Sequence, residues 1–84
     1  SREQIAVLLY KYALYMGYDT ELAYTDLSAY TDIGSVSGYA ETAVRWAIEN
    51  GIISGSGSRL DPQGVATRAQ AAALLERFVT KFCS

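Results

Sequence analysis

Two segments of the chain place apolar residues three or four positions apart, which is the spacing of an amphipathic helix. They are residues 1–16, SREQIAVLLYKYALYM, and residues 67–82, TRAQAAALLERFVTKF. Each begins with a hydroxyl residue followed three positions later by Gln, the pattern of a capping box at a helix start. We therefore expect two long helices that repeat one another. Their expected buried stripes are Ile5, Leu8, Leu9, Tyr12 and Met16 in the first, and Ala71, Leu74, Leu75, Phe78, Val79 and Phe82 in the second.

A third amphipathic segment runs from about Tyr39 to Asn50, with Ser37 as its expected cap. Gly51 follows as a helix stop, because glycine adopts the left-handed conformation at a helix C-terminus without steric cost. Small side chains in the buried stripe favour close helix packing, whereas Trp46 is expected to straddle the stripe and the surface. The stripe consists of Ala40, Ala43, Val44, Ala47 and Ile48.

The connections between these helices are long and rich in turn-forming residues. Gly17 is expected to end the first helix, and residues 20–28 allow a short helical segment. The run Asp61-Pro62-Gln63-Gly64 predicts a tight turn, because Pro presets its second position and Gly closes it. The residues expected to be buried beneath the loops or beside this turn are Tyr24, Leu27, Tyr30, Ile33, Tyr39, Leu60 and Val65.

Together these elements predict an all-α fold. We expect a small helical bundle of two long repeat helices, a shorter middle helix and long ordered loops. The two repeat helices are expected to pack together through their leucine stripes, with the middle helix laid across them. A chain of 84 residues forms one small domain at most, with a core that is marginal on its own.

The charge balance narrows the classes of partner. The net charge is −2 and the arginines are spread along the chain, which argues against nucleic acid as the main partner. No apolar run approaches the length of a transmembrane helix, so we expect no membrane insertion. Cys83 cannot form an internal disulfide, because it is the one cysteine. It is either an intermolecular or reactive thiol or an incidental terminal residue.

The chain offers little for catalysis. Histidine is absent, which removes the commonest general base and the commonest metal ligand. Nine acidic residues are present, but the sequence marks out no pair of carboxylates that a glycosidase would need. We interpret these acids as a solvated face. We therefore expect no enzyme activity, no catalytic residue, no cofactor and no metal site.

Short motifs follow one another in a fixed order from Tyr30 onwards. They are YTD at 30–32, YA at 39–40, alanines at 43 and 47, NGIISG at 50–55, LDP at 60–62 and ATRAQ at 66–70. Their order and spacing resemble those of an S-layer homology (SLH) domain. Residues 30–84 resemble one repeat, and residues 1–16 resemble the closing helix of a preceding repeat, so the chain reads as a fragment of something longer. Residues 17–29 form the connection, which holds an insertion because Ser1 and Thr67 are 66 positions apart.

The resemblance implies a noncatalytic anchoring module of a secreted bacterial protein, located outside the cell at the wall or surface. Such domains bind secondary cell-wall polysaccharide, an anionic and often pyruvylated glycan, in grooves between neighbouring SLH repeats. The implied partners are this or another wall glycan, together with neighbouring repeats or a homo-oligomer. The alternative is a structural module that self-associates or binds protein without glycan. That alternative is kept open because Gln4 and Gln70 replace the acidic residue that is usual in the repeat motif.

The candidate glycan-binding residues are Arg2, Arg68, Gln70, Asp32, Tyr39 and Trp46. Arg2 and Arg68 match the arginine of the repeat motif, and a guanidinium beside free helix N–H groups would suit an anionic carboxylate. The alternative is that each arginine pairs with a local acid such as Asp32 or Asp61 and fixes a loop. Asp32 is expected to hold a loop. Most of the seven tyrosines are expected to fill the core, and a minority could stack on sugar rings at a groove rim.

Overall fold

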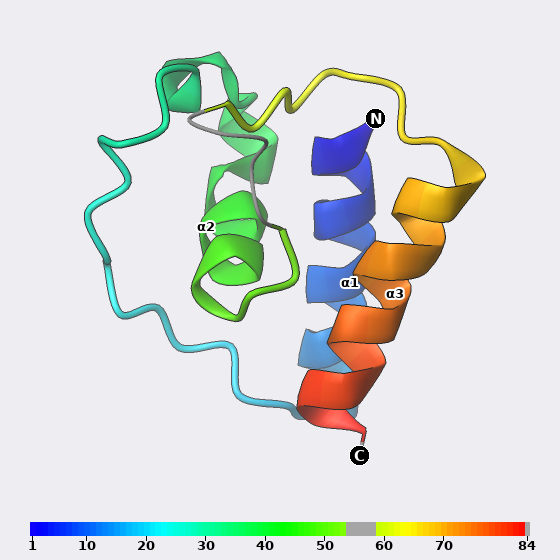
Figure 1. Ribbon diagram of the computed structural model, residues 1–84. Coiled ribbons are helices and arrows are strands. Elements are labelled where there is room, and N and C mark those ends of the chain that lie inside the picture. Colours follow the sequence, from blue (N-terminus) through cyan, green and yellow to red (C-terminus); the bar gives the residue numbers. More distant parts are fainter. Residues whose placement is uncertain (54–58, 84) are drawn as a thin grey trace.

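The computed structural model describes residues 1–53 and 59–83. Within these ranges the regular elements are α1 (Arg2–Met16), α2 (Glu41–Glu49) and α3 (Arg68–Phe82), with 3-10 turns η1 (Ile33–Ser35) and η2 (Gly38–Ala40). None of these elements is a strand, so the all-α prediction is confirmed. The three helices run in the same direction, and long connections return the chain to the start of the next helix (Figure 1). No helix of the described ranges is both long and apolar enough to span a bilayer.

The starts of α1 and α3 are fixed by the predicted capping boxes. The Ser1 and Thr67 hydroxyls accept hydrogen bonds from the backbone N–H groups of Gln4 and Gln70, at 3.4 and 3.1 Å. The Gln side chains accept in return from the backbone nitrogens of Ser1 and Thr67, at 2.9 and 3.0 Å. Each box provides acceptors for backbone N–H groups that have no partner within the helix. The sequence pattern therefore predicted the starts of both helices correctly.

The middle of the chain departs from prediction in two places. The α-helix begins at Glu41 rather than near Tyr39, and Ser37 makes no side-chain cap. The Ser37 hydroxyl and N–H both donate to the carboxylate of Glu3 instead. Residues 20–28 form an irregular loop and no helix. Gly51 ends the helix in the left-handed conformation as expected, with φ of 72°.

The core is built around an aromatic side chain that the sequence pattern had left at the surface. Trp46 is fully buried, which corrects the expectation that it straddles stripe and surface. Its ring contacts Tyr10 of α1 at 5.5 Å between centroids, and Phe78 and Phe82 of α3 at 6.1 and 5.6 Å. Aromatic contacts from both long helices therefore converge on α2. The predicted small-residue stripe of α2 is confirmed at Ala40, Ala43, Val44 and Ala47.

The predicted leucine seam between the repeat helices is wrong in large part. Of the four leucines in the expected stripes, Leu9 and Leu74 are buried, while Leu8 and Leu75 are 67% and 52% exposed. The buried face of α1 is Glu3, Ala6, Leu9 and Ala13, and small alanines allow α1 to lie close against α2. Among the expected stripe residues, those that are exposed are Leu8, Tyr12, Met16, Leu75 and Val79.

The loop predictions are mixed. Leu27 and Leu60 are buried as expected, and Tyr30 and Ile33 are half-buried. The expectations for Tyr24, Tyr39 and Val65 are wrong, because all three are exposed. The Cys83 thiol is free and lies 3.4 Å from the Tyr18 hydroxyl. Residues 54–55, the end of the NGIISG motif, lie outside the described residues.

Candidate functional site

The start of α1 lies against the turn formed by residues 61–64. The Gly64 N–H donates to the Asp61 carbonyl at 3.0 Å, which confirms the predicted turn. The N–H groups of Arg2 and Glu3 donate to the carbonyls of Gly64 and Pro62, at 3.2 and 3.0 Å. The first N–H groups of a helix have no acceptor within the helix, so the turn satisfies them. The expectation that they stay free for an anion is therefore wrong for α1.

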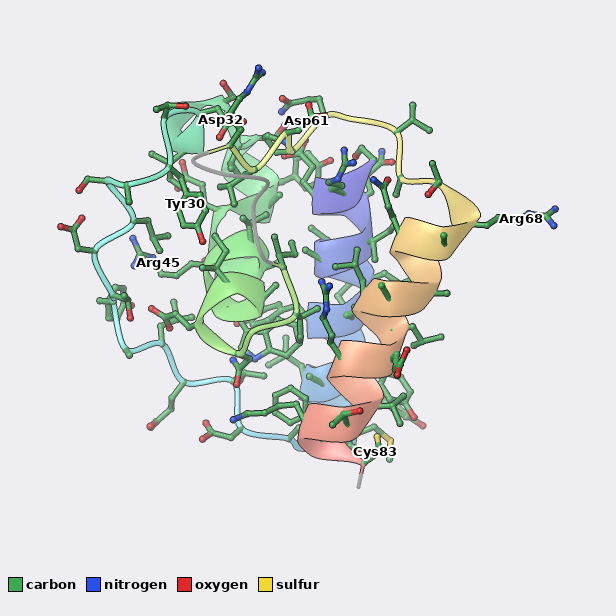
Figure 2. All side chains as sticks on the ribbon, viewed as in Figure 1. Tyr30, Asp32, Arg45, Asp61, Arg68 and Cys83 are labelled. Carbon is green, nitrogen blue, oxygen red and sulfur yellow. The ribbon has the colours of Figure 1, made fainter. Side chains whose placement is uncertain are left out.

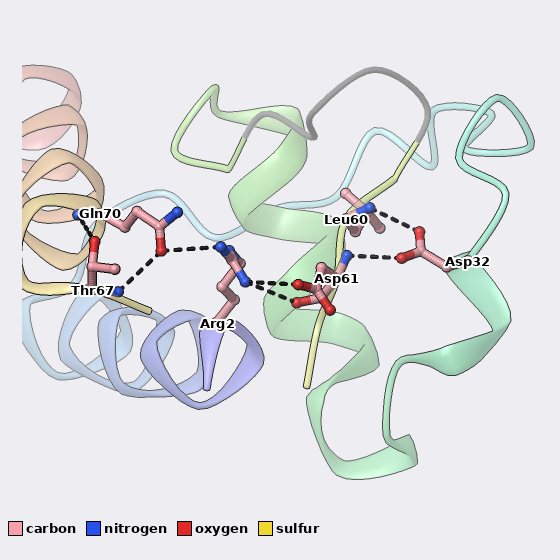
Figure 3. A network of polar contacts seen from close by, with 6 residues as sticks. All are labelled: Arg2, Asp32, Leu60, Asp61, Thr67 and Gln70. Atoms are coloured by element: carbon pink, nitrogen blue, oxygen red, sulfur yellow. Dashed lines mark hydrogen bonds and ion pairs between the residues drawn. The ribbon is translucent and has the colours of Figure 1, made fainter. Parts of the chain in front are cut away.

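Arg2 joins three segments at this point (Figure 3). Its Nη1 lies 3.1 Å from the Asp61 carboxylate, and its Nη2 donates to Gln70 Oε1 at 3.0 Å. The same Gln70 oxygen accepts from the Thr67 N–H in the cap of α3. A Cβ at Gly64 would collide with Arg2 Nη1 and the Asp61 carboxylate, so a larger residue there would displace this ion pair. The guanidinium is thus held in a fixed orientation between the starts of α1 and α3.

Asp32 supports the same arrangement from the other side of the turn. Its two carboxylate oxygens accept from the N–H groups of Leu60 and Asp61, both at 2.8 Å (Figure 3). These two backbone hydrogen bonds lower the pKa of Asp32, because they favour its charged form. The carboxylate of Asp32 therefore positions the backbone of Asp61, and through it the acceptor that holds Arg2.

A groove with a volume of about 450 Å³ opens beside this network. Its charged side chains are three arginines against one aspartate, and its floor is apolar. Arg77 at one wall donates to the Ile52 carbonyl at 3.2 Å, and Arg59 at another is exposed. The groove is lined by Arg2, Ile53, Arg59, Leu60, Asp61, Gln70, Ala73, Leu74 and Arg77. A concave surface with this charge excess attracts anions.

The structure brings together only some of the candidate residues. Arg2 and Gln70 line the groove, and Asp32 supports it through Asp61. Arg68 points away from the molecule into solvent (Figure 2). Tyr39 is 65% exposed and does not line the groove. Trp46 is enclosed in the core and presents no ring face to a ligand.

Sequence reasoning missed Arg59 and Arg77 as groove residues. Arg77 had a detectable signal, because Gln70, Ala73 and Arg77 are spaced three and four positions apart and so share one face of α3. Arg59 had none. It approaches the groove because Asp32 binds the backbone of the following residues, and that contact spans 28 positions of sequence.

A second polar cluster is buried next to the groove network. Glu3 is 3% exposed, and its carboxylate accepts from the Ser37 N–H at 2.9 Å, the Ser37 hydroxyl at 2.7 Å and Gln63 Nε2 at 3.2 Å. Burial raises the pKa of Glu3, but the hydrogen bonds from Ser37 and Gln63 outweigh it, so the pKa is lowered. The interpretation of all nine acids as a solvated face is therefore wrong for Glu3.

Among the described residues, no three or more Cys, Asp or Glu side chains lie together in a way that could hold a metal ion. The site geometry thus offers a basic groove with a rigid guanidinium, an amide and an apolar floor. Such a surface can hold an anionic ligand by charge-assisted hydrogen bonds and by contact with apolar ring faces.

Comparison with known families identifies the fold. The family model for the S-layer homology domain matches residues 29–72, just over half of the chain. The chain belongs to this family. No curated protein and no solved structure matches this SLH chain at a significant level. SLH domains are noncatalytic anchoring modules associated with the cell surface. Asp32, Asp61 and Gln70 lie within the matched range, whereas Arg2 and Arg77 lie outside it.

Proposed function

We propose that this SLH chain anchors its parent protein to the bacterial cell wall by binding an anionic glycan in the arginine-lined groove. The ligand class is secondary cell-wall polysaccharide, including pyruvylated forms. The observation that carries the proposal is the concentration of Arg2, Arg59 and Arg77 around one concave surface with Asp61 as the opposing charge. Because the whole chain is weakly acidic, this local excess of positive charge is not a product of composition.

The groove suits a charged sugar for two physical reasons. Arginine binds carboxylates through paired N–H donors, and such charge-assisted hydrogen bonds are stronger than neutral ones. Arg2 is already held by Asp61 and Gln70, so little side-chain entropy is lost when a ligand binds. The apolar floor of Ile53, Leu60 and Leu74 fits the C–H face of a sugar ring.

The proposal assigns different roles to the candidate residues. Arg2 and Gln70 contact the glycan together with Arg59 and Arg77. Asp32 acts as a positioning residue, because its carboxylate fixes the backbone that carries Asp61. Arg68 and Tyr39 are surface residues outside the groove, and Trp46 supports the core.

Calorimetric titration with purified secondary cell-wall polysaccharide tests this proposal through a matched pair of variants. Arg59→Gln and Arg68→Gln each remove one exposed positive charge, but only Arg59 lines the groove. We expect Arg59→Gln to weaken binding about tenfold, the loss expected for one hydrogen bond between charged groups. Arg68→Gln should bind like the unmodified chain, and added salt should weaken binding in both.

Equal losses in the two variants would contradict the groove assignment, since they would reflect net charge alone. Absence of binding by a chain shown to be folded by circular dichroism would contradict the glycan proposal itself. Arg77→Gln gives an independent check, because Arg77 lies on a different wall of the groove from Arg59.

A second candidate function is self-association or binding to a neighbouring repeat. It is favoured by large apolar side chains left exposed on α1 and α3. Tyr12 of α1 contacts the buried Phe78 ring of α3 at 5.9 Å between centroids, so this exposed residue lies where α1 and α3 pack together. The exposed residues are Leu8, Tyr12, Leu14, Tyr15 and Met16 on α1, and Leu75 and Val79 on α3. Burial of such a surface would stabilise an interface.

Sedimentation velocity over a range of concentrations tests this alternative. Self-association that is lost in Leu75→Lys, and kept in Ala69→Lys on an exposed position of a different face of the same helix, would support it. A chain that stays monomeric at high concentration would count against a homo-oligomer.

A further inference from the structure

A second cleft of about 370 Å³ lies between α2 and the long connection that precedes it. Three of its lining residues, Leu22, Tyr24 and Leu27, come from the inserted connection and precede the range matched by the SLH family model. The cleft shares none of its lining residues with the arginine-lined groove. The cleft is therefore formed partly by the matched domain and partly by the connection that precedes it.

The cleft has an apolar floor and a polar rim. Leu27, Val36 and Val44 are buried at its base, and Leu22 and Ile33 are half-buried beside them. Glu41, Thr42 and Arg45 of α2 supply a carboxylate, a hydroxyl and a guanidinium along one side. An apolar surface with a few convergent polar groups is the usual composition of a small-molecule site, and this volume falls at the low end of the range of about 300–1,000 Å³. The size suits a ligand of a single ring.

Tyr24 is held in an exposed position at the rim of this cleft. The N–H groups of Ala23 and Thr25, on either side of it, donate to the two carboxylate oxygens of Glu49 at 2.8 and 2.9 Å. Arg45 donates to the Thr25 carbonyl at 2.7 Å and lies 5.6 Å from the centre of the Tyr24 ring. Tyr24 is nevertheless 75% exposed, so its ring stays accessible to a ligand. A fixed, open aromatic face offers contact area at little entropic cost.

The charges around the cleft set it apart from the arginine-lined groove. Arg45 is already paired with Glu49, at 3.7 Å between Nη1 and Oε2, and Glu41 adds a further negative charge at the rim. The balance is one positive charge against two negative charges, so an anion is repelled. A neutral ligand with hydroxyl groups can instead use the Glu41 carboxylate as acceptor and the Thr42 hydroxyl as donor or acceptor.

We propose that this cleft is a binding site for a neutral saccharide ring, with the sugar's C–H face against Tyr24 and the apolar floor and its hydroxyls toward Glu41 and Thr42. This site is distinct from the anionic groove in place, in charge and in the residues that form it. Its existence does not depend on binding in that groove.

Amide chemical-shift titration of the isotope-labelled chain tests the proposal with two probes that differ by one charge. Methyl glucoside is neutral, and methyl glucuronide carries a carboxylate at the same ring. We expect the glucoside to cause saturable shifts at the amides of Leu22, Leu27, Ile33 and Thr42. The affinity for the glucuronide, measured at the same amides, should be lower by about fivefold or more, because the rim of the cleft is net negative.

Matched variants assign the effect to the ring and the rim. Tyr24→Asn removes the aromatic face while keeping a residue that tolerates the positive φ of 55° at this position. Tyr39→Asn removes another exposed tyrosine that does not line the cleft. Thr42→Val removes a hydroxyl from an exposed helix position with little change of shape. We expect Tyr24→Asn and Thr42→Val to weaken glucoside binding, and Tyr39→Asn to leave it unchanged.

The proposal is overturned by glucoside shifts that do not saturate, or by saturable shifts that Tyr24→Asn leaves unchanged in a folded chain. Shifts centred on Arg59 and Arg77 would also overturn it, because they would place the neutral sugar in the other groove. The Arg59→Gln variant keeps the two proposals distinguishable, since it should weaken the polysaccharide titration and leave the glucoside shifts as they are.

Discussion

Glu3 shows how a single charged side chain can be accommodated at a helix–loop junction. Its carboxylate is buried, yet it accepts hydrogen bonds from Ser37 and Gln63, which come from two different loops. A buried charge is costly unless its hydrogen-bonding capacity is filled, and here three donors fill it. Gln63 Nε2 also donates to the Ser35 carbonyl, so the same cluster ties the turn after Asp61 to η1.

Replacing this carboxylate should therefore destabilise the fold. We expect Glu3→Ala to lower the free energy of unfolding by about 1–3 kcal/mol, because it removes the carboxylate that accepts from the Ser37 N–H and the Ser37 hydroxyl. Urea denaturation at neutral pH measures the change. Glu76→Ala is the control, since Glu76 is exposed on α3, and it should change stability by less than about 0.5 kcal/mol. Equal effects of the two substitutions would show that burial of Glu3 contributes nothing.

At the scale of helices, packing faces are decided by which side chains allow close approach. The buried face of α1 follows positions 3, 6, 9 and 13, where two alanines let the backbone lie near α2. The larger residues at positions 8 and 12 remain outside. A prediction of the buried face from the largest apolar residues is thus wrong for part of α1, although the prediction of a helix is right.

The two adjacent leucines of α3 give a direct test of this packing. Leu74 is 7% exposed and Leu75 is 52% exposed. We expect Leu74→Ala to cost about 2–5 kcal/mol, because it removes buried apolar surface and leaves a cavity. Leu75→Ala should cost well under half as much in the same thermal or urea unfolding experiment. A reversed order of the two values would mean that α3 presents a different face to the core.

Features encoded within a few residues were predictable from the sequence, and features that join distant segments were not. Both capping boxes, the stop at Gly51 and the turn closed by Gly64 depend on local contacts, and all are confirmed. The network of Arg2, Asp61 and Gln70 joins residues up to 68 positions apart, and no periodicity reports such a contact. The short helix allowed at residues 20–28 does not form, because Glu49 binds the backbone N–H groups of Ala23 and Thr25 in a non-helical conformation.

Over the whole molecule, carboxylates hold the long loops to the helices and to one another. Asp32 binds the backbone of residues 60–61, Glu49 binds that of residues 23 and 25, and Glu3 binds Ser37. Asp26 accepts from the Ser28 N–H within the same long connection. In all four of these carboxyl groups, hydrogen bonds to the charged form outweigh desolvation, so the pKa of each carboxyl is lowered from its ordinary value. Both candidate clefts are therefore shaped by loops whose attachment depends on ionised acids.

This arrangement predicts that the chain loses stability in acid. A carboxyl whose pKa is lower in the folded state binds protons more readily when unfolded, so its contribution is complete at neutral pH. That contribution declines as the pH falls below about 4, the ordinary range for these groups, and through the lowered folded-state pKa. Unfolding free energies from urea denaturation at several pH values should thus decrease steadily below about pH 4.

Asp32→Asn tests whether titration of Asp32 contributes to this loss of stability, since an amide can still accept from Leu60 or Asp61 but does not titrate. The variant should be less stable at neutral pH and should show a shallower decline in acid. Parallel pH profiles for the two chains would mean that Asp32 takes no part in the acid transition.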